Sequence, residues 1–249
     1  PRPASTRLLL ADMKPFLTCI PLACALLANP AGAAGVVPES SVLIVDEATG
    51  EGTMVVQNTD AAPVLLYTTI ENIAEDPEEM VVVTPPMARL EAGQSQLVRF
   101  MLTKKGPLAT QRFKRVAFEG IPFARGADNQ VQTTFRQNIP MIIQPRALEK
   151  LKDPWTRLSS SVDGDKLRLC NDSGYVVRLA QQARLDSANV NLPLPKTYLL
   201  PGERFELPLA GKRAATAGTV TIWPATVYGY AAGSYAIPLS NGCSQTPAK

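Results

Sequence analysis

This 249-residue chain contains no histidine. The side chains that could do chemistry are therefore limited to carboxylates, basic groups, hydroxyls and four cysteines. Without imidazole there is no Ser–His–Asp or Cys–His nucleophile, no histidine-containing zinc site and no imidazole pH switch. Residues 93–97 (GQSQL) lack the second glycine of a nucleophile elbow, and the sequence contains no glycine-rich phosphate loop or Cys-x-x-Cys pair. Only catalysis by paired carboxylates from distant loops stays open, since such pairs produce no recognisable spacing pattern in the sequence. The sequence therefore predicts a protein that is not an enzyme and has no cofactor or metal.

The first 34 residues have the pattern of an export signal. Met13 opens a charged start, residues 15–28 (PFLTCIPLACALLA) form an apolar run, and Ala31–Ala33 (AGA) fits the small-x-small cleavage rule. The run is shorter than the roughly 20 apolar residues that a membrane-spanning helix needs. We therefore expect residues 1–34 to be an N-terminal extension and a signal peptide.

Removal of that signal leaves Cys170 and Cys243 as the two cysteines of the mature chain. In an exported protein, two cysteines favour a disulfide. A reactive thiol is the weaker alternative, so we predict the Cys170–Cys243 bridge.

Composition indicates an ordinary folded protein, with 45% apolar and 19% charged residues. The length without the leader suits two domains of roughly 100 residues each. Most of the net charge of +3 belongs to residues 1–34, which hold three basic residues and one acidic residue. The rest is close to neutral, which gives no electrostatic reason to expect nucleic acid or an anionic membrane as a partner.

The elements that must position any site read as strands. Short segments rich in Val, Ile, Thr and Phe alternate with Gly, Pro, Asn and Asp clusters, and seven of them in the first half fit one immunoglobulin-like sandwich. These seven are Ser41–Val45, Thr53–Asn58, Val64–Ile70, Met80–Val83, Ser95–Leu102, Phe113–Phe118 and Val131–Ile143.

A second set of seven segments predicts a second β-sandwich. They are Leu158–Val162, Lys166–Cys170, Val176–Ala183, Lys196–Leu200, Arg204–Pro208, Gly218–Trp223 and Ser234–Leu239. Asp163-Gly164 is a hairpin signal between the first two. The only helical character lies at residues 145–153, between two prolines, and the halves show no clear internal repeat.

Three passages carry a family resemblance. Residues 84–99 (TPPMARLEAGQSQLVR), 116–122 (VAFEGIP) and 135–145 (FRQNIPMIIQP) resemble sequences of the periplasmic chaperones of the chaperone–usher pathway, the PapD-like pilus-assembly chaperones. Residues 199–202 (LLPG) resemble the equivalent part of the second domain of that family. The first passage is long and specific, and together the passages span nearly the whole mature chain.

The resemblance implies an all-β protein of two immunoglobulin-like β-sandwich domains in an L-shaped arrangement, over residues 35–146 and 147–249. It implies a periplasmic chaperone that binds, folds and caps pilus subunits and delivers them to an outer-membrane usher. It also implies no small-molecule substrate, and unpaired strand edges would permit a self-capping homodimer.

The residues expected to serve the subunit lie on the last strand of the first domain. In the family, this strand completes a subunit that lacks its own final strand, so that main-chain bonds satisfy the ladder and alternate side chains fill pockets. The matched positions are Val131, Thr133 and Phe135. Thr133 is smaller and more polar than the family's usual residue, which predicts weaker pocket filling.

A second site, the anchor for the subunit's terminal carboxylate, departs from the family pattern. The family's two basic residues align with Val42 and Pro140, which cannot bind a carboxylate. Arg115 and Arg136 are the nearest substitutes, and an arginine at position 115 resembles a divergent, archaic branch of the family. Guanidinium geometry suits a carboxylate. The alternative is that Arg115 and its basic neighbours are solvated surface residues.

Other positions carry weaker expectations. Pro63 and Ile121 match an interloop pair that guards the family's usher-binding surface, and Arg99 matches an arginine near it, although packing roles are equally open. Glu75–Glu79 (EDPEE) is expected to be a solvated acidic loop without calcium-loop spacing.

Two non-enzymatic alternatives compete with the chaperone. A secreted adhesin or pilus subunit would need one incomplete sandwich instead of two strand sets. A carbohydrate-binding module would need exposed aromatic residues, but only 6% of residues are aromatic.

Overall fold

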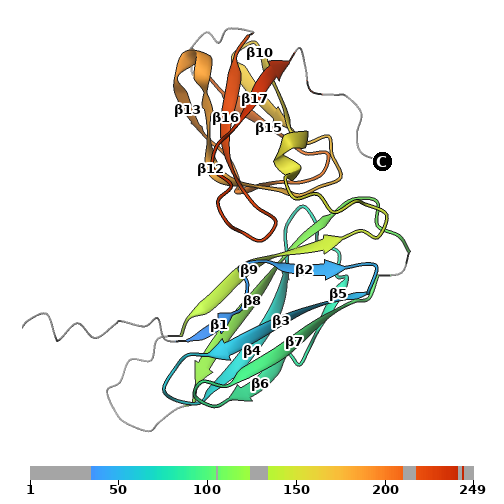
Figure 1. The fold of residues 1–249 in the computed structure, drawn as a ribbon, viewed down its shortest axis with the longest axis vertical. Helices are drawn as coiled ribbons and strands as arrows, with labels where there is room; N and C mark the ends of the chain where they lie inside the picture. The colour runs from blue at the N-terminus through green and yellow to red at the C-terminus, as the bar shows by residue number, and fades with distance from the viewer. Residues whose placement is uncertain (1–34, 105, 124–133, 210–216, 241–242, 244–249) are drawn as a thin grey trace, which may run out of the picture. The chain divides into compact units, whose positions relative to one another are not determined.

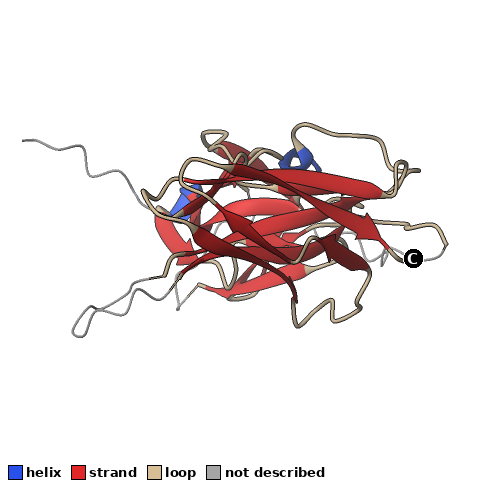
Figure 2. Cartoon of the chain, turned by 90° about the horizontal axis from the view of Figure 1, so that it is seen from below, coloured by secondary structure: helices blue, strands red, loops and turns tan. Residues whose placement is uncertain are grey.

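The fold is known from a computed structural model, which describes residues 35–104, 106–123, 134–209, 217–240 and 243. Figure 2 shows that the described chain is built from strands. Its helical segments are two 3-10 turns, η2 (Pro154–Arg157) and η3 (Asp186–Ala188). The predicted signal in residues 1–34 lies outside the described residues.

Nine strands form the first β-sandwich, in the order β5-β7-β3-β2-β9-β8-β4-β6, with β1 paired to β3 (Figure 1). Neighbours run antiparallel except β2 and β9, which are parallel. The strands are β1 (Val36–Pro38), β2 (Leu43–Asp46), β3 (Glu51–Asn58), β4 (Val64–Asn72), β5 (Val81–Thr84), β6 (Met87–Leu90), β7 (Ser95–Leu102), β8 (Arg112–Pro122) and β9 (Arg136–Gln144).

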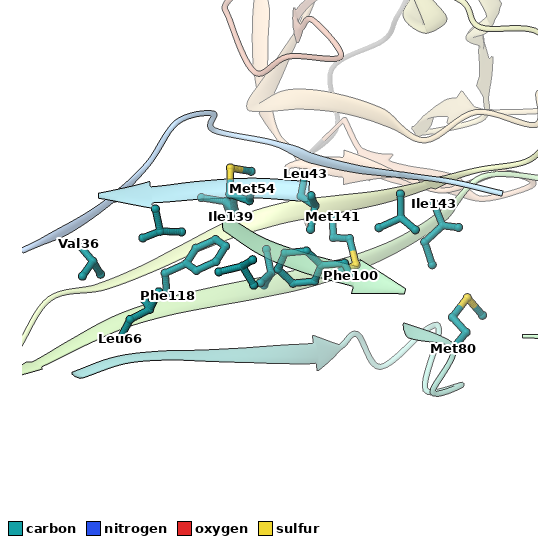
Figure 3. Close-up of a cluster of buried hydrophobic side chains, with 14 of the residues drawn as sticks. Val36, Leu43, Met54, Leu66, Met80, Phe100, Phe118, Ile139, Met141 and Ile143 are labelled. Atoms are coloured by element: carbon teal, nitrogen blue, oxygen red, sulfur yellow. The ribbon is translucent and has the colours of Figure 1, made fainter. Parts of the chain in front are cut away.

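Alternation along these strands builds the first core. In β7, Val98 and Phe100 are fully buried, whereas Leu97 and Arg99 face outward. Phe100 meets Phe118 of β8 edge to face at 6.3 Å between ring centroids. Figure 3 shows these rings among the side chains of Leu43, Met54, Leu66, Ile139 and Met141.

The second β-sandwich has the order β13-β12-β16-β17-β10-β11-β15, with β14 paired to β12. A second buried cluster, which includes Leu167, Leu185, Leu207 and Ile222, fills it. Its strands are β10 (Ser159–Asp163), β11 (Lys166–Cys170), β12 (Val177–Leu185), β13 (Val190–Pro193), β14 (Tyr198–Leu199), β15 (Arg204–Pro208), β16 (Thr219–Ala225) and β17 (Tyr235–Ser240).

The predicted disulfide is confirmed. Cys170 at the end of β11 is bonded to Cys243 beyond β17, with 6.0 Å between their Cα atoms. The bridge therefore fastens the chain beyond β17 to the end of β11.

The structure confirms the two strand sets and corrects some bounds. Strands β7, β11 and β15 have the predicted limits, whereas the short strands β1, β6 and β13 were not foreseen. The helical character expected at residues 145–153 is wrong, since these residues form turns and irregular chain.

One corner occurs in both sandwiches, although the sequence suggests no repeat. Asn58 Nδ2 donates to the carbonyls of Ala62, Leu90 and Glu91, and Asn171 Nδ2 donates to those of Tyr175, Leu199 and Leu200. Both asparagines are fully buried. In each corner the main-chain carbonyl of the asparagine accepts a hydrogen bond from the main-chain N–H of a glycine, Gly93 or Gly202. The φ of each glycine is near +75°, a conformation that glycine adopts without strain and that the turn requires.

Replacing either buried asparagine with alanine is expected to lower the free energy of unfolding by about 1–3 kcal/mol, because buried carbonyls lose their donor. Urea denaturation of Asn58→Ala and Asn171→Ala measures the loss. Asn191→Ala, at an exposed asparagine on β13, is the control and should change stability by less than about 0.5 kcal/mol. Equal effects at all three positions would contradict a structural role for the corner.

Candidate functional site

Strand β9 has an open edge along its first half. On one side it pairs with β8 from Arg136 to Ile143. On the other side β2 pairs only with Met141–Gln144. Among the described residues, no strand pairs with that second side over Arg136–Pro140. An uncovered strand edge is a template for one more strand.

Phe135 directly precedes this edge and is 54% exposed. An aromatic ring that is left in water beside an open edge can bury apolar area when another chain pairs there. Val131 and Thr133, the other two residues predicted to fill pockets, lie outside the described residues.

A polar network covers the outward face of β4, β8 and β9. Arg136 forms an ion pair with Glu71, whose second carboxylate oxygen accepts from Asn138 Nδ2 at 2.7 Å. Asn138 Oδ1 in turn accepts from Arg115 Nε at 2.6 Å, and its carbonyl accepts from Arg115 Nη2 at 2.6 Å. The structure thus links both predicted anchor residues, Arg115 and Arg136, through Glu71 and Asn138.

Arg115 lies where the open edge ends. Its register partner on β9 is Pro140, which follows the exposed segment Arg136–Asn138. Val42, the other position where the family resemblance expects a basic residue, is 5% exposed and packs with Phe113 and Ile142. Neither Val42 nor Pro140 has a charge, whereas Arg115 places a cation at this end of the edge.

A second arginine, Arg178 on β12, lies close to Arg115. Burial lowers the pKa of Arg178, and the charge of Arg115 lowers it further. The two sandwiches touch here through an apolar cluster, in which the rings of Phe113 and Tyr198 lie 4.5 Å apart. Sequence reasoning missed Arg178, because an arginine in a strand of the other sandwich gives no local signal.

The basic neighbours of Arg115 are not solvated surface residues. Lys114 is 1% exposed, and its Nζ lies 2.9 Å from Asp76 Oδ1 and 2.8 Å from the Glu78 carbonyl. Arg112 Nε binds the other Asp76 oxygen at 2.7 Å. The expectation that Glu75–Glu79 is a solvated loop is therefore wrong at Asp76, which is 5% exposed.

The three residues expected near a partner surface lie apart from Arg115. Ile121 is the register partner of Leu65 on β4, and Pro63 stands just before that strand. Arg99 is exposed on β7 between Thr53 and Thr84. The positions of Pro63, Arg99 and Ile121 do not test their predicted contact with an usher, which stays a prediction.

Two structural features are absent from the described residues. They contain no group of three or more His, Cys, Asp or Glu side chains that could hold a metal ion. No helix within the same ranges is long and apolar enough to cross a membrane.

Two immunoglobulin-like sandwiches with an open edge on the last strand of the first define a class of protein, and comparisons of the sequence agree with it. Residues 35–149 match the family model described as pili and flagellar-assembly chaperone, PapD N-terminal domain. The chain is 38% identical over 208 residues to the uncharacterized fimbrial chaperone YhcA of Escherichia coli (strain K12). The aligned region covers 83% of this chain and 92% of YhcA. The chain therefore belongs to the family of PapD-like pilus-assembly chaperones.

Solved structures show the same fold. A chain of the Salmonella enterica SafA pilin–SafB chaperone complex has a TM-score of 0.67 at 19% identity, with 84% of this chain and 98% of that chain covered. The E. coli chaperone DraB also has a TM-score of 0.67, at 20% identity, with 83% and 99% covered. The fold-class prediction of two immunoglobulin-like sandwiches is confirmed.

Proposed function

We propose that this chaperone works in the periplasm and binds a pilus subunit by adding the open edge of β9 to the subunit's incomplete sheet. The observation that carries the proposal is the uncovered side of Arg136–Pro140, bordered by the exposed Phe135. Main-chain bonds along the edge satisfy the subunit's unpaired groups, and the alternate side chains Val131, Thr133 and Phe135 enter its apolar pockets. The same contacts hide a surface that would otherwise aggregate.

In this proposal Arg115 holds the subunit's terminal carboxylate at the end of the edge. Arg136 assists indirectly, because its ion pair with Glu71 fixes Asn138, which orients the Arg115 guanidinium. An oriented guanidinium loses less freedom when it forms a charge-assisted bidentate bond. The resemblance of Arg115 to the archaic branch stays a prediction.

The remaining expectations belong to the same proposal. The chain acts by binding without catalysis and hands the subunit to an outer-membrane usher, with Pro63, Arg99 and Ile121 near the contact. The unliganded protein caps its own edge as a homodimer. Residues 35–146 and 147–249 are the two domains.

Charge reversal at Arg115 tests the proposal. Arg115→Glu is expected to abolish co-purification of a pilus subunit that wild type captures when the two are co-expressed in a periplasm, because a carboxylate at position 115 repels the subunit terminus. Arg204→Glu, at an exposed arginine of β15, is the matched control and should capture as well as wild type.

Circular dichroism checks that both variants stay folded. Undiminished capture by folded Arg115→Glu contradicts the anchor. Absence of capture by the wild-type protein contradicts the proposed function as a whole.

A further inference from the structure

Arg178 carries a partly buried positive charge that no carboxylate of the described residues balances. Its Nη1 atom is inaccessible to solvent and has no hydrogen-bond partner among the described residues. No carboxylate in the described ranges forms an ion pair with it. A guanidinium stays charged in a protein, and burying it without a partner is costly. Such an arrangement in the free protein indicates that the balancing group comes with a ligand.

The loop between β16 and β17 passes close to this nitrogen. A Cβ atom at Gly229 would lie 3.4 Å from Arg178 Nη1, 3.2 Å from Val42 Cγ2 and only 2.2 Å from Ser41 Oγ. Gly229 has a φ of +91°, and the neighbouring Tyr228 carbonyl accepts from Ser41 Oγ at 3.0 Å. The absence of a side chain at Gly229 therefore lets the loop approach Arg178 and the start of β2 closely.

The charges around Arg178 do not supply a partner. Arg115 is near enough to act on it with the same sign. Glu71, the acid on the Arg115 side, already binds Arg136 and Asn138 through its two carboxylate oxygens. Two guanidinium groups, one from each sandwich, thus share a region of positive potential at the end of the open β9 edge.

We propose that Arg178 is the second ligand of the subunit's terminal carboxylate, so that one arginine from each sandwich holds it. This rests on the proposed function, in which a strand lies along Arg136–Pro140 and stops beside Arg115. A single negative group between Arg115 and Arg178 removes both the repulsion and the unpaired charge. A carboxylate that bridges the two sandwiches also couples capture of the subunit to their contact at Phe113 and Tyr198.

Acetate, the smallest carboxylate with a methyl group, is the probe for a direct test on the full chain. In a ¹⁵N-NMR titration at constant ionic strength, the Nε–H signals of Arg115 and Arg178 should shift together on one saturation curve, whereas neutral acetamide should shift neither. Arg178→Met should weaken acetate binding at Arg115 by about 10- to 100-fold, the range for a lost hydrogen bond to a charged group. Arg204→Met is the matched control and should bind like wild type.

An acetate affinity of Arg178→Met equal to that of wild type would overturn the proposal. Thermal unfolding separates function from structure. Because the substitution removes an unpaired, partly buried charge, Arg178→Met should unfold at or above the wild-type midpoint, whereas a structural role would lower it.

Co-purification distinguishes this inference from the proposed function. Wild type should capture the co-expressed subunit, and Arg178→Met should capture at least tenfold less. Extending the subunit by two serines moves its carboxylate and should weaken capture by wild type but not further by Arg178→Met. If wild type captures and Arg178→Met captures equally, only the role of Arg178 fails. If wild type captures nothing, the proposed function fails.

Discussion

Replacing Asp76 with asparagine is expected to lower the free energy of unfolding by about 3–5 kcal/mol, the usual cost of removing one partner from a buried ion pair. Lys114 is 1% exposed and Asp76 is 5% exposed, so neither charge can turn to water when its partner is lost. The amide introduced at position 76 would still accept a hydrogen bond but would leave the Lys114 ammonium uncompensated. Denaturant unfolding of Asp76→Asn measures the loss.

Two comparisons make this prediction specific. The double variant Asp76→Asn/Lys114→Met should recover much of the stability, because no buried charge remains. Glu91→Gln breaks the exposed pair with Arg89, whose side chains are 59% (Arg89) and 58% (Glu91) exposed, and should cost less than about 1 kcal/mol. An Asp76→Asn effect no larger than that of Glu91→Gln would contradict the role of the buried pair.

The Asp76–Lys114 pair also makes the free energy of unfolding depend on pH. Burial acts to raise the pKa of Asp76, but hydrogen bonds from Arg112 and Lys114 outweigh it and lower the pKa. A carboxyl group whose pKa is lower in the folded state stabilises the fold above its unfolded pKa, about 3.9, and loses that contribution as pH falls through the folded value. Wild type should therefore lose stability below about pH 4 more steeply than Asp76→Asn.

Much of the fold could be predicted from the sequence, because alternation and turn residues act locally. Strands β7, β11 and β15 combine alternation of polar and apolar residues with turn residues close to their ends, and their bounds agree with the prediction. The Asn58 and Asn171 corners could not be foreseen, since the carbonyls that each asparagine binds lie up to 33 residues away. The hydrogen bonds of each asparagine form only when segments that are distant in the sequence come together in the fold.

The site was predictable in part for the same reason. Phe135 and Arg115 follow from strand pattern and family resemblance, but burial of Lys114 and Asp76 is a tertiary property that charge runs do not reveal. Arg178 is the clearest case, because it lies in the other sandwich and its unpaired state depends on the loop at Gly229. The sequence therefore predicts the position of the β9 edge better than it predicts which charged side chains surround that edge.

Removing the disulfide with Cys170→Ala/Cys243→Ala is expected to lower the free energy of unfolding by about 4 kcal/mol, as the chain-entropy model gives for a link across 73 residues. The loss should concentrate in the second sandwich. Within the described residues, strand β17 joins β10 through two register pairs, Ser160–Leu239 and Ser161–Ser240, so the bond to Cys243 holds the chain where the described pairing is sparse. Hydrogen exchange should then show reduced protection in β16 and β17 and little change in β8.

The double substitution leaves no free thiol that could form mixed disulfides, and reduced wild type should reproduce its unfolding midpoint in denaturant. Equal loss of protection in β8 and β17 would mean that the bridge stabilises both sandwiches as one cooperative unit. A change below about 1 kcal/mol would mean that native pairing already fixes the C-terminal strand. The expected result, a weakened second sandwich beside an intact β9 edge, predicts that the variant still presents Arg136–Pro140 for strand addition but holds Arg178 less firmly against Arg115.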